Sequence, residues 1–384
     1  MKPEDFADNT AGQCKRARQG YWAFVPNPLP PKLDYPSSLV RLLTDANWAL
    51  GELAGVGRLL PNPHLLIAPH IRREALLSSR IEGTQATLDE LFLFEAVPPR
   101  ADPAPDLREV INYIRAMEYG LERLKTLPIS GRLVRDIHKH LVEGVRGTHS
   151  TPGKFRTTQN WIGPPGCTLN DATFVPPPVQ DMKDAFSDWE KYLHSEASEP
   201  LLVQCALMHY QFEVIHPFLD GNGRVGRLLI TFFMCERGYL PQPLLYLSAY
   251  FERNRAEYYD RLLRVSTAGD WHGWLEFFLR GIVSEAKDAV NWSAQLMGLH
   301  ESYRQRLLGK RVPKGTRRIV DSLLVNPYVT IKGASQEWSL SYKTARSAIR
   351  TLVELNILEE VTGRRRDRVY CARELLHILS RLEG

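Results

Sequence analysis

The sequence predicts an all-α fold with one small β-hairpin, followed by a separate C-terminal domain. Apolar residues recur at helical spacing through most of the chain, and short β-prone segments flank a turn at residues 164–166. Positive charge is concentrated near the C-terminus. With 384 residues, the chain is long enough for two or three domains and a substantial buried core.

The composition is typical of a globular protein. Hydrophobic residues make up 43% of the chain and charged residues 24%. No run approaches the ~20 apolar residues of a membrane helix, and the N-terminus lacks the features of a signal peptide. We therefore expect a cytoplasmic protein with no membrane partner. The five cysteines are scattered without a Cys-x-x-Cys pair, so neither a disulfide framework nor a zinc site is expected.

Residues 1–105 are predicted to form an N-terminal helical region. The first 19 residues are polar and unpatterned, and we expect them to be a loose arm. Apolar periodicity then predicts two helices, over about 37–53 and 65–81.

The end of the second of these helices carries a charge that needs a partner. The helix closes at Gly83, and Thr87 with Glu90 forms a capping box for the next helix. Glu82 therefore lies at a helix C-terminus, where the helix dipole disfavours an anion. We expect a cationic side chain beside it.

Residues 106–300 are predicted to form the core of the protein. Between Gly153 and Pro178, β-prone segments flank a turn and indicate a hairpin. The remaining apolar-periodic runs predict helices, which we expect over 106–124, 130–145, 201–215, 225–237, 254–265 and 271–289.

The C-terminal part of the chain is strongly basic. Residues 310–384 contain 15 Lys plus Arg against eight Asp plus Glu, whereas the rest of the chain is slightly acidic. Residues 301–315 read as a linker, and residues 316–384 resemble a winged helix-turn-helix. Its helices are expected over 316–325, 331–338 and 341–355, and a hairpin with a basic tip over 359–370. Such a domain can bind DNA or dock proteins, and the sequence leaves both open.

Residues 216–227, HPFLDGNGRVGR, contain more candidate catalytic and ligand-binding residues than any other stretch of the chain. His216 precedes a proline, which disfavours continuing the preceding helix. Arg224 and Arg227 share one face at the start of the next helix, where the dipole disfavours each cation by roughly 0.3–1 kcal/mol. Backbone N–H groups and guanidinium donors that converge in this way are typical of a polyphosphate site.

Other residues of this stretch suit the same chemistry. Gly221 and Gly223 have no side chains, so a ligand can approach the backbone closely. Asp220 supplies a carboxylate for a magnesium ion that bridges phosphates. His216 can accept a proton at neutral pH.

These twelve residues match the motif HxFxDGNGRxxR at every specified position, so the chain resembles the Fic-domain proteins. The resemblance implies the Fic fold and a protein adenylyltransferase, which transfers AMP from ATP to Ser, Thr or Tyr hydroxyls of proteins, itself included. By the same resemblance, His216 would deprotonate the hydroxyl and Asp220 would hold Mg²⁺. Arg224 would contact the β-phosphate and Arg227 the γ-phosphate.

Further roles follow from the resemblance alone. The anion hole for the α- and β-phosphates would be formed by Gly221, Asn222 and Gly223. Tyr258 would stack near the adenine, although packing in the core explains it almost as well. Residues 153–178 would form a flap that covers the nucleotide and aligns the target backbone by strand addition.

The chain also resembles the family in a second, inhibitory motif. Ser78, Glu82 and Gly83 fit the pattern Ser/Thr-x-x-x-Glu-Gly/Asn. The resemblance implies that Glu82 pairs with Arg227 and keeps the γ-phosphate from a productive position. An intermolecular contact, for example in a homodimer, could release it.

Two alternative functions remain open at this point. A member of this family can transfer a different phosphate-containing group or reverse the modification. The chain could also be a DNA-binding regulator that acts through residues 316–384 and uses its Fic domain as a nucleotide sensor.

Overall fold

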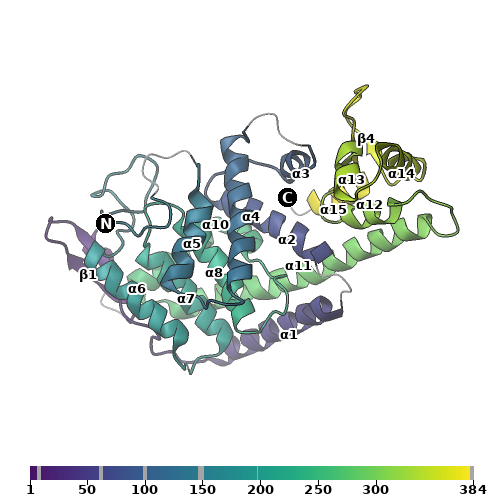
Figure 1. The fold of residues 1–384 in the computed structure, drawn as a ribbon. Helices are drawn as coiled ribbons and strands as arrows, with labels where there is room; N and C mark the ends of the chain where they lie inside the picture. Colours follow the sequence, from purple (N-terminus) through teal and green to yellow (C-terminus); the bar gives the residue numbers. More distant parts are fainter. Residues whose placement is uncertain (7–9, 60–63, 98–101, 146–150, 197, 381–384) are drawn as a thin grey trace.

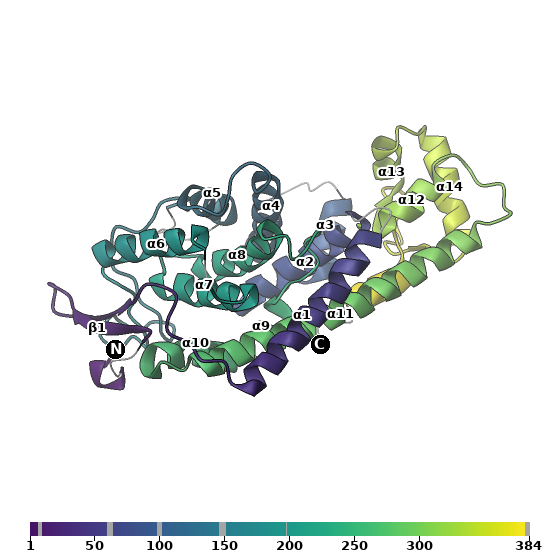
Figure 2. The same ribbon diagram turned by 90° about the horizontal axis from the view of Figure 1, so that it is seen from below.

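The structure is a computed structural model, and it describes every residue except 7–9, 60–63, 98–101, 146–150, 197 and 381–384. It is mostly helical, as predicted (Figures 1 and 2). None of the helices in the described part combines the length and apolar character that crossing a bilayer requires. The helices of the main body are α1 (Ser37–Leu59), α2 (His64–Ile81), α3 (Leu88–Ala96), α4 (Pro105–Arg123), α5 (Gly131–Val142), α6 (Val179–His194), α7 (Leu201–Ile215), α8 (Asn222–Glu236), α9 (Ser248–Arg253) and α10 (Arg255–Ala268).

The N-terminal residues are more ordered than their sequence indicates. Strands β1 (Gly12–Arg16) and β2 (Trp22–Pro26) pair antiparallel, so the predicted loose arm is wrong for the described residues of this part. The backbone N–H of Phe24 donates to the carbonyl of Val175 at 2.9 Å. The hairpin is thus held by a segment some 150 residues away, which no local pattern reveals.

The hairpin predicted between Gly153 and Pro178 is not formed as a pair of strands. A single antiparallel bridge joins Ile162 and Phe174, with N···O distances of 2.8 and 3.0 Å. Prolines lie on both sides of this bridge and have no N–H to donate, so a longer ladder cannot form. They are Pro164, Pro165, Pro176, Pro177 and Pro178.

Helix α11 (Trp271–Arg306) connects the main body to the C-terminal part of the chain. The predicted helix ended at residue 289 and the predicted linker began at 301, and both boundaries are wrong. Trp292, Leu296 and Tyr303 are buried on one face of the added turns, so apolar packing extends the helix. Figure 2 shows α1 lying along α11, and the two helices are in contact over much of α1.

The C-terminal part contains helices and a small sheet at the end of α11 (Figure 1). The three predicted helices and the predicted pairing within residues 359–370 are confirmed, and one further helix follows. The sheet is antiparallel with the order β3-β5-β4. Its elements are α12 (Thr316–Leu323), β3 (Tyr328–Thr330), α13 (Ile331–Glu337), α14 (Tyr342–Glu354), β4 (Glu359–Glu360), β5 (Val369–Cys371) and α15 (Arg373–Ser380).

This C-terminal part is docked on α3. The side-chain amide of Asn326 donates to the carbonyl of Phe92 at 2.9 Å, and the hydroxyl of Tyr328 donates to Asp89. Glu95, on the same helix, pairs with Arg72 of α2 at 2.8 Å. Helix α3 therefore contacts both the C-terminal part and α2.

Close packing between α4 and α8 makes a testable prediction at Gly120. A Cβ atom at this position would lie 2.2 Å from the ring of Phe232, which is fully buried and has no space to retreat. Gly120→Ala should therefore lower the free energy of unfolding by about 1–3 kcal/mol, as measured by urea denaturation.

Gly51 of α1 provides the matched control, because a Cβ atom there would meet nothing within 4 Å. Gly51→Ala should raise the free energy of unfolding by about 0.5–1 kcal/mol through helix propensity. Equal effects of the two substitutions would contradict the packing described for Gly120.

Candidate active site

The turn between α7 and α8 forms the centre of the site. Helix α7 ends at His216, whose φ of 48° is left-handed, and α8 begins after Gly221, which has a φ of 79°. Asn222 closes the turn: its side chain accepts from the N–H of Phe218 and donates to the carbonyl of the same residue, both at 2.9 Å. The N–H groups of the first turn of α8 are left to face a ligand.

His216 is held as a neutral imidazole. Its Nδ1 lies 3.1 Å from the carbonyl of Glu213, so Nδ1 carries the proton and Nε2 is left as an acceptor. Removal from water is the largest influence on the pKa of His216. Although the hydrogen bond to Glu213 raises this pKa, removal from water together with the charge of Arg156 lowers it to about 4. The imidazole is therefore uncharged at neutral pH, with Nε2 free to accept a proton.

Arg156 supports the backbone of His216. Its side chain is only 1% exposed, and it donates to the carbonyl of His216 at 2.9 Å and to that of Pro177 at 2.5 Å. Burial lowers the pKa of Arg156 to about 10, so it remains a cation at neutral pH. Neither spacing nor periodicity in the sequence points to this residue.

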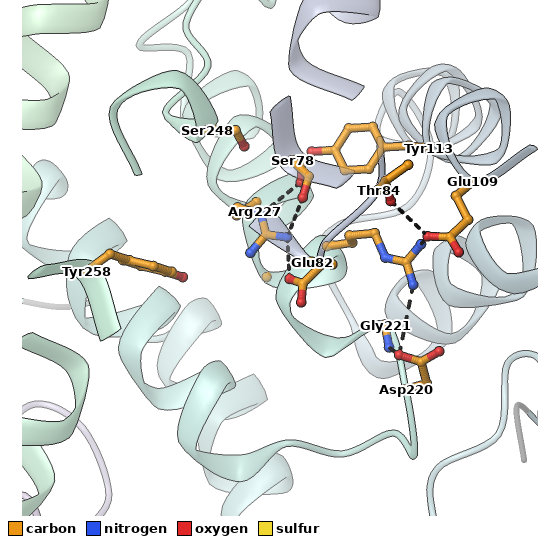
Figure 3. Close-up of polar contacts among 12 residues, drawn as sticks. Ser78, Glu82, Thr84, Glu109, Tyr113, Asp220, Gly221, Arg227, Ser248 and Tyr258 are labelled. Carbon is orange, nitrogen blue, oxygen red and sulfur yellow. Dashed lines mark hydrogen bonds and ion pairs between the residues drawn. The ribbon is translucent and has the colours of Figure 1, made fainter. Parts of the chain in front are cut away.

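Arg227 is bound by the end of α2, as Figure 3 shows. Its Nε donates to Ser78 Oγ at 2.8 Å, and its Nη2 donates to the carbonyl of Ser78 at 2.9 Å and to Glu82 Oε1 at 2.6 Å. The side chain of Arg227 is 2% exposed and that of Glu82 is 35% exposed. Burial raises the pKa of Glu82, but Arg227 outweighs it, and the pKa is lower than usual. The predicted pairing of Glu82 with a cation is confirmed.

A buried carboxylate positions α2 behind this contact. Glu74 accepts from the hydroxyls of Tyr113 at 2.9 Å and Ser248 at 2.6 Å. Burial raises its pKa to about 7. These bonds join α2 to α4 and α9, and they hold Ser78 one turn further along α2 against Arg227.

Arg224, in the first turn of α8, is bound by different carboxylates from those that bind Arg227. Its Nη1 is 2.7 Å from Glu109 Oε2, and its Nη2 is 3.9 Å from Asp220 Oδ1. Glu109 lies on α4, and no motif in the sequence around it indicates that it belongs to the site.

Asp220 is the carboxylate best placed to contact a metal together with a bound phosphate. Its side chain is 63% exposed, and its Oδ1 accepts from the N–H of Gly221 at 2.6 Å. In the part of the chain that the structure describes, no three His, Cys, Asp or Glu side chains are grouped as metal ligands. Mg²⁺ is commonly held by one or two carboxylates together with substrate phosphates, and a lone Asp220 fits that mode.

Tyr258 lies in the core. Its ring is 1% exposed and stacks on Phe251 with the centroids 4.4 Å apart, and its hydroxyl is 2.8 Å from His209 Nε2. This placement agrees with the core alternative for Tyr258 and not with an adenine contact. Tyr259, which follows it, is 43% exposed.

Two segments of the chain match known domain families. Residues 40–122 match the Fic/DOC family N-terminal domain, and residues 128–234, which include the whole turn between α7 and α8, match the Fic/DOC family domain. The chain therefore contains both domains of the Fic/DOC family. The α7–α8 turn with its two arginines is therefore the Fic motif in its folded form.

Curated relatives of this Fic chain include enzymes by name. It is 29% identical over 172 residues to the protein adenylyltransferase Fic of Drosophila grimshawi, covering 44% of this chain and 32% of the relative. It is 29% identical over 175 residues to a probable protein adenylyltransferase of Aquifex aeolicus, covering 44% of this chain and 49% of the relative. The chain thus matches less than half the length of either relative.

Solved structures share the fold at low sequence identity. A crystal structure of a Fic family protein from Desulfovibrio desulfuricans superposes with a TM-score of 0.57 at 19% identity, over 90% of this chain and 98% of that one. Fic-1 from C. elegans, residues 134–508, gives a TM-score of 0.50 at 20% identity, over 68% of this chain and 74% of that one.

The position of His216 predicts an unusual titration. Its C–H signals in an NMR spectrum should stay constant from pH 8 down to about pH 5 and titrate near pH 4. The unfolded chain takes up this proton near the ordinary pKa of 6.5. The contribution of His216 to the free energy of unfolding is therefore fully present above pH 6.5 and is lost as the pH falls from 6.5 to about 4.

The His216→Asn variant assigns the signal by its disappearance. A midpoint near 6.5 in the folded protein would contradict the enclosed, neutral imidazole described above.

Proposed function

We propose that this Fic protein transfers AMP from ATP to Ser, Thr or Tyr hydroxyls of proteins, including its own. One observation carries the proposal: an uncharged His216 and two buried arginines, Arg224 and Arg227, surround the uncapped start of α8. The names of the two curated relatives support the same activity.

The proposed reaction uses these groups in a single displacement. Nε2 of His216 takes the proton from the attacking hydroxyl, whose oxygen forms a bond to the α-phosphorus of ATP. The bond from that phosphorus to the bridging oxygen breaks, and pyrophosphate leaves. The N–H groups of Gly221, Asn222 and Gly223, with Arg224, stabilise the charge on the phosphates. Mg²⁺ bound to Asp220 and the phosphates would neutralise part of that charge.

We further propose that Glu82 inhibits this reaction. Two donor atoms of Arg227, Nε and Nη2, are already used by Ser78 and Glu82. A γ-phosphate that needs Arg227 must first displace the carboxylate. The contact is only partly enclosed, since Glu82 is 35% exposed, so water or a partner can reach it.

Removing the inhibitory carboxylate should activate the enzyme. With ATP labelled at the α-phosphate, Glu82→Gly should increase label incorporation about tenfold or more, because a charge-assisted contact with Arg227 no longer competes with ATP. Incorporation is measured by autoradiography of the chain itself and of added lysate proteins.

His216→Ala in the Glu82→Gly background is the control. Loss of the general base should reduce incorporation by about 10²–10⁴-fold. If the original chain and both variants incorporate label equally, the proposed activity is wrong.

We also propose that residues 316–384 are a winged helix-turn-helix that binds the DNA backbone. The supporting observation is an exposed basic surface formed by α14 and the β4–β5 loop, with Lys343, Arg346, Arg350, Arg364, Arg365, Arg366 and Arg368. Five further cations line a 410 Å³ hollow at the start of α12, namely Lys310, Arg311, Lys314, Arg317 and Arg318.

DNA binding through phosphates has a characteristic salt dependence. Replacing Arg364, Arg365 and Arg366 with Ala should weaken binding to any duplex and reduce the slope of log affinity against log salt by about 2–3. The measurement is fluorescence anisotropy with a labelled duplex between 50 and 200 mM salt.

Three exposed arginines of the main body give the matched control: Arg41, Arg115 and Arg132. Their triple replacement with Ala changes the net charge equally and should leave the slope unchanged. Absence of binding by the full chain at 50 mM salt would overturn the DNA proposal while leaving adenylyl transfer untouched.

A further inference from the structure

Glu109 has a position in this site that the motif does not account for. It lies on α4, outside residues 216–227, and its Oε2 is 2.7 Å from Arg224 Nη1. The side chain of Arg224 is 4% exposed and that of Glu109 is 23% exposed. A cation buried to this degree needs a charged partner close by, and Glu109 is the nearest carboxylate that the structure describes.

The two arginines of the site are bound in different ways. Arg227 has hydrogen bonds on both Nε and Nη2, and one of them goes to Glu82. Arg224 is held tightly at Nη1 only. Among the described residues its Nε has no hydrogen-bond partner, and its Nη2 has only the 3.9 Å contact with the exposed Asp220. One end of its guanidinium is thus anchored while the other donors remain unused.

Arg224 is thus fixed in place by Glu109 but can still bind a ligand, whereas the donors of Arg227 are occupied by Ser78 and Glu82. A free arginine side chain loses rotamer freedom when it binds a phosphate, whereas one held by a carboxylate has already lost it. Since Glu109 binds Nη1 and Nε is buried, Nη2 is the donor atom of Arg224 that is left to contact an anion.

We infer that Glu109 is a positioning residue that fixes Arg224 for the β-phosphate of a nucleoside diphosphate or triphosphate. The inference deepens the proposed adenylyl transfer and rests on it. Glu82 and Glu109 then have opposite effects on their arginines: Glu82 occupies Nη2 of Arg227, whereas Glu109 binds Nη1 of Arg224 and leaves Nη2 to the phosphate.

Thr84 joins Glu109 to the turn at residues 82–84, which follows α2 and contains Glu82 (the inhibitory turn). Its hydroxyl donates to Glu109 Oε2 at 3.3 Å, and the residue is buried two positions after Glu82. The same oxygen of Glu109 therefore contacts both Thr84 and Arg224 (Figure 3). Helix α4 anchors Arg224 and the end of the inhibitory turn together.

The test compares ADP with AMP, because only ADP has a β-phosphate. Dissociation constants of both nucleotides with Mg²⁺ are measured by isothermal titration calorimetry, in the full-length Glu82→Gly chain so that the inhibitory carboxylate is absent. Glu109→Ala should weaken ADP binding about tenfold and change AMP binding less than about twofold. A general structural defect would weaken both nucleotides alike.

Two further variants complete the experiment. Glu109→Gln keeps the size and one oxygen acceptor, so it should recover most of the ADP affinity, to within about threefold of the parent, and it substitutes for Glu109→Ala if that variant does not fold. Glu118→Ala removes an exposed carboxylate from the same helix and should change neither constant.

The possible outcomes distinguish a failure of the inference about Glu109 from a failure of the proposed adenylyl transfer. If Glu109→Ala leaves the ratio of ADP to AMP affinity unchanged, or tightens ADP, then Glu109 does not position Arg224 and the inference is overturned while nucleotide binding stands. If the Glu82→Gly parent binds no ADP at all, the proposed function itself fails and the inference fails with it.

Discussion

The burial of Arg227 at the start of α8 is the constraint on which the rest of the site depends. A cation at a helix N-terminus opposes the helix dipole, and burial adds a desolvation cost. The protein meets this cost by bringing the end of α2 over α8, so that Ser78 and Glu82 together bind the guanidinium. The position of α2, with the Glu74 hydrogen bonds behind it, follows from this requirement.

The turn between α7 and α8, beside Arg227, is held by side chains that form hydrogen bonds to its backbone carbonyls. Arg156 donates to the carbonyl of His216 at 2.9 Å and Asn160 to that of Phe218 at 2.8 Å, while His138 Nε2 lies 3.0 Å from that of Asp220. These side chains come from α5 and the proline-rich segment after it, not from the motif. Because the carbonyls are fixed from behind, the N–H groups on the opposite side are preorganised for a phosphate.

Helix α3 joins this arrangement to the C-terminal part of the chain. It accepts hydrogen bonds from Asn326 and Tyr328 on one side and pairs with Arg72 of α2 on the other. Helix α2, whose end binds Arg227, is therefore connected through α3 to the basic C-terminal part of the chain. The long helix α11 provides the covalent connection along a different path.

Local patterns in the sequence determined most helices, the capping box at Thr87 and the pairing of residues 359–370, because each depends on neighbours a few residues away. A twelve-residue motif likewise indicated the Fic domain, which the family comparison confirms. The pairing of β1 with β2, the single bridge in the predicted flap and the burial of Tyr258 were decided only by tertiary structure. So were the contacts of Arg156 with His216 and of Glu109 with Arg224, whose partners lie 60 and 115 residues apart. Contacts over such separations depend on how helices pack against one another, and this packing produces no local pattern in the sequence from which the contacts could be predicted.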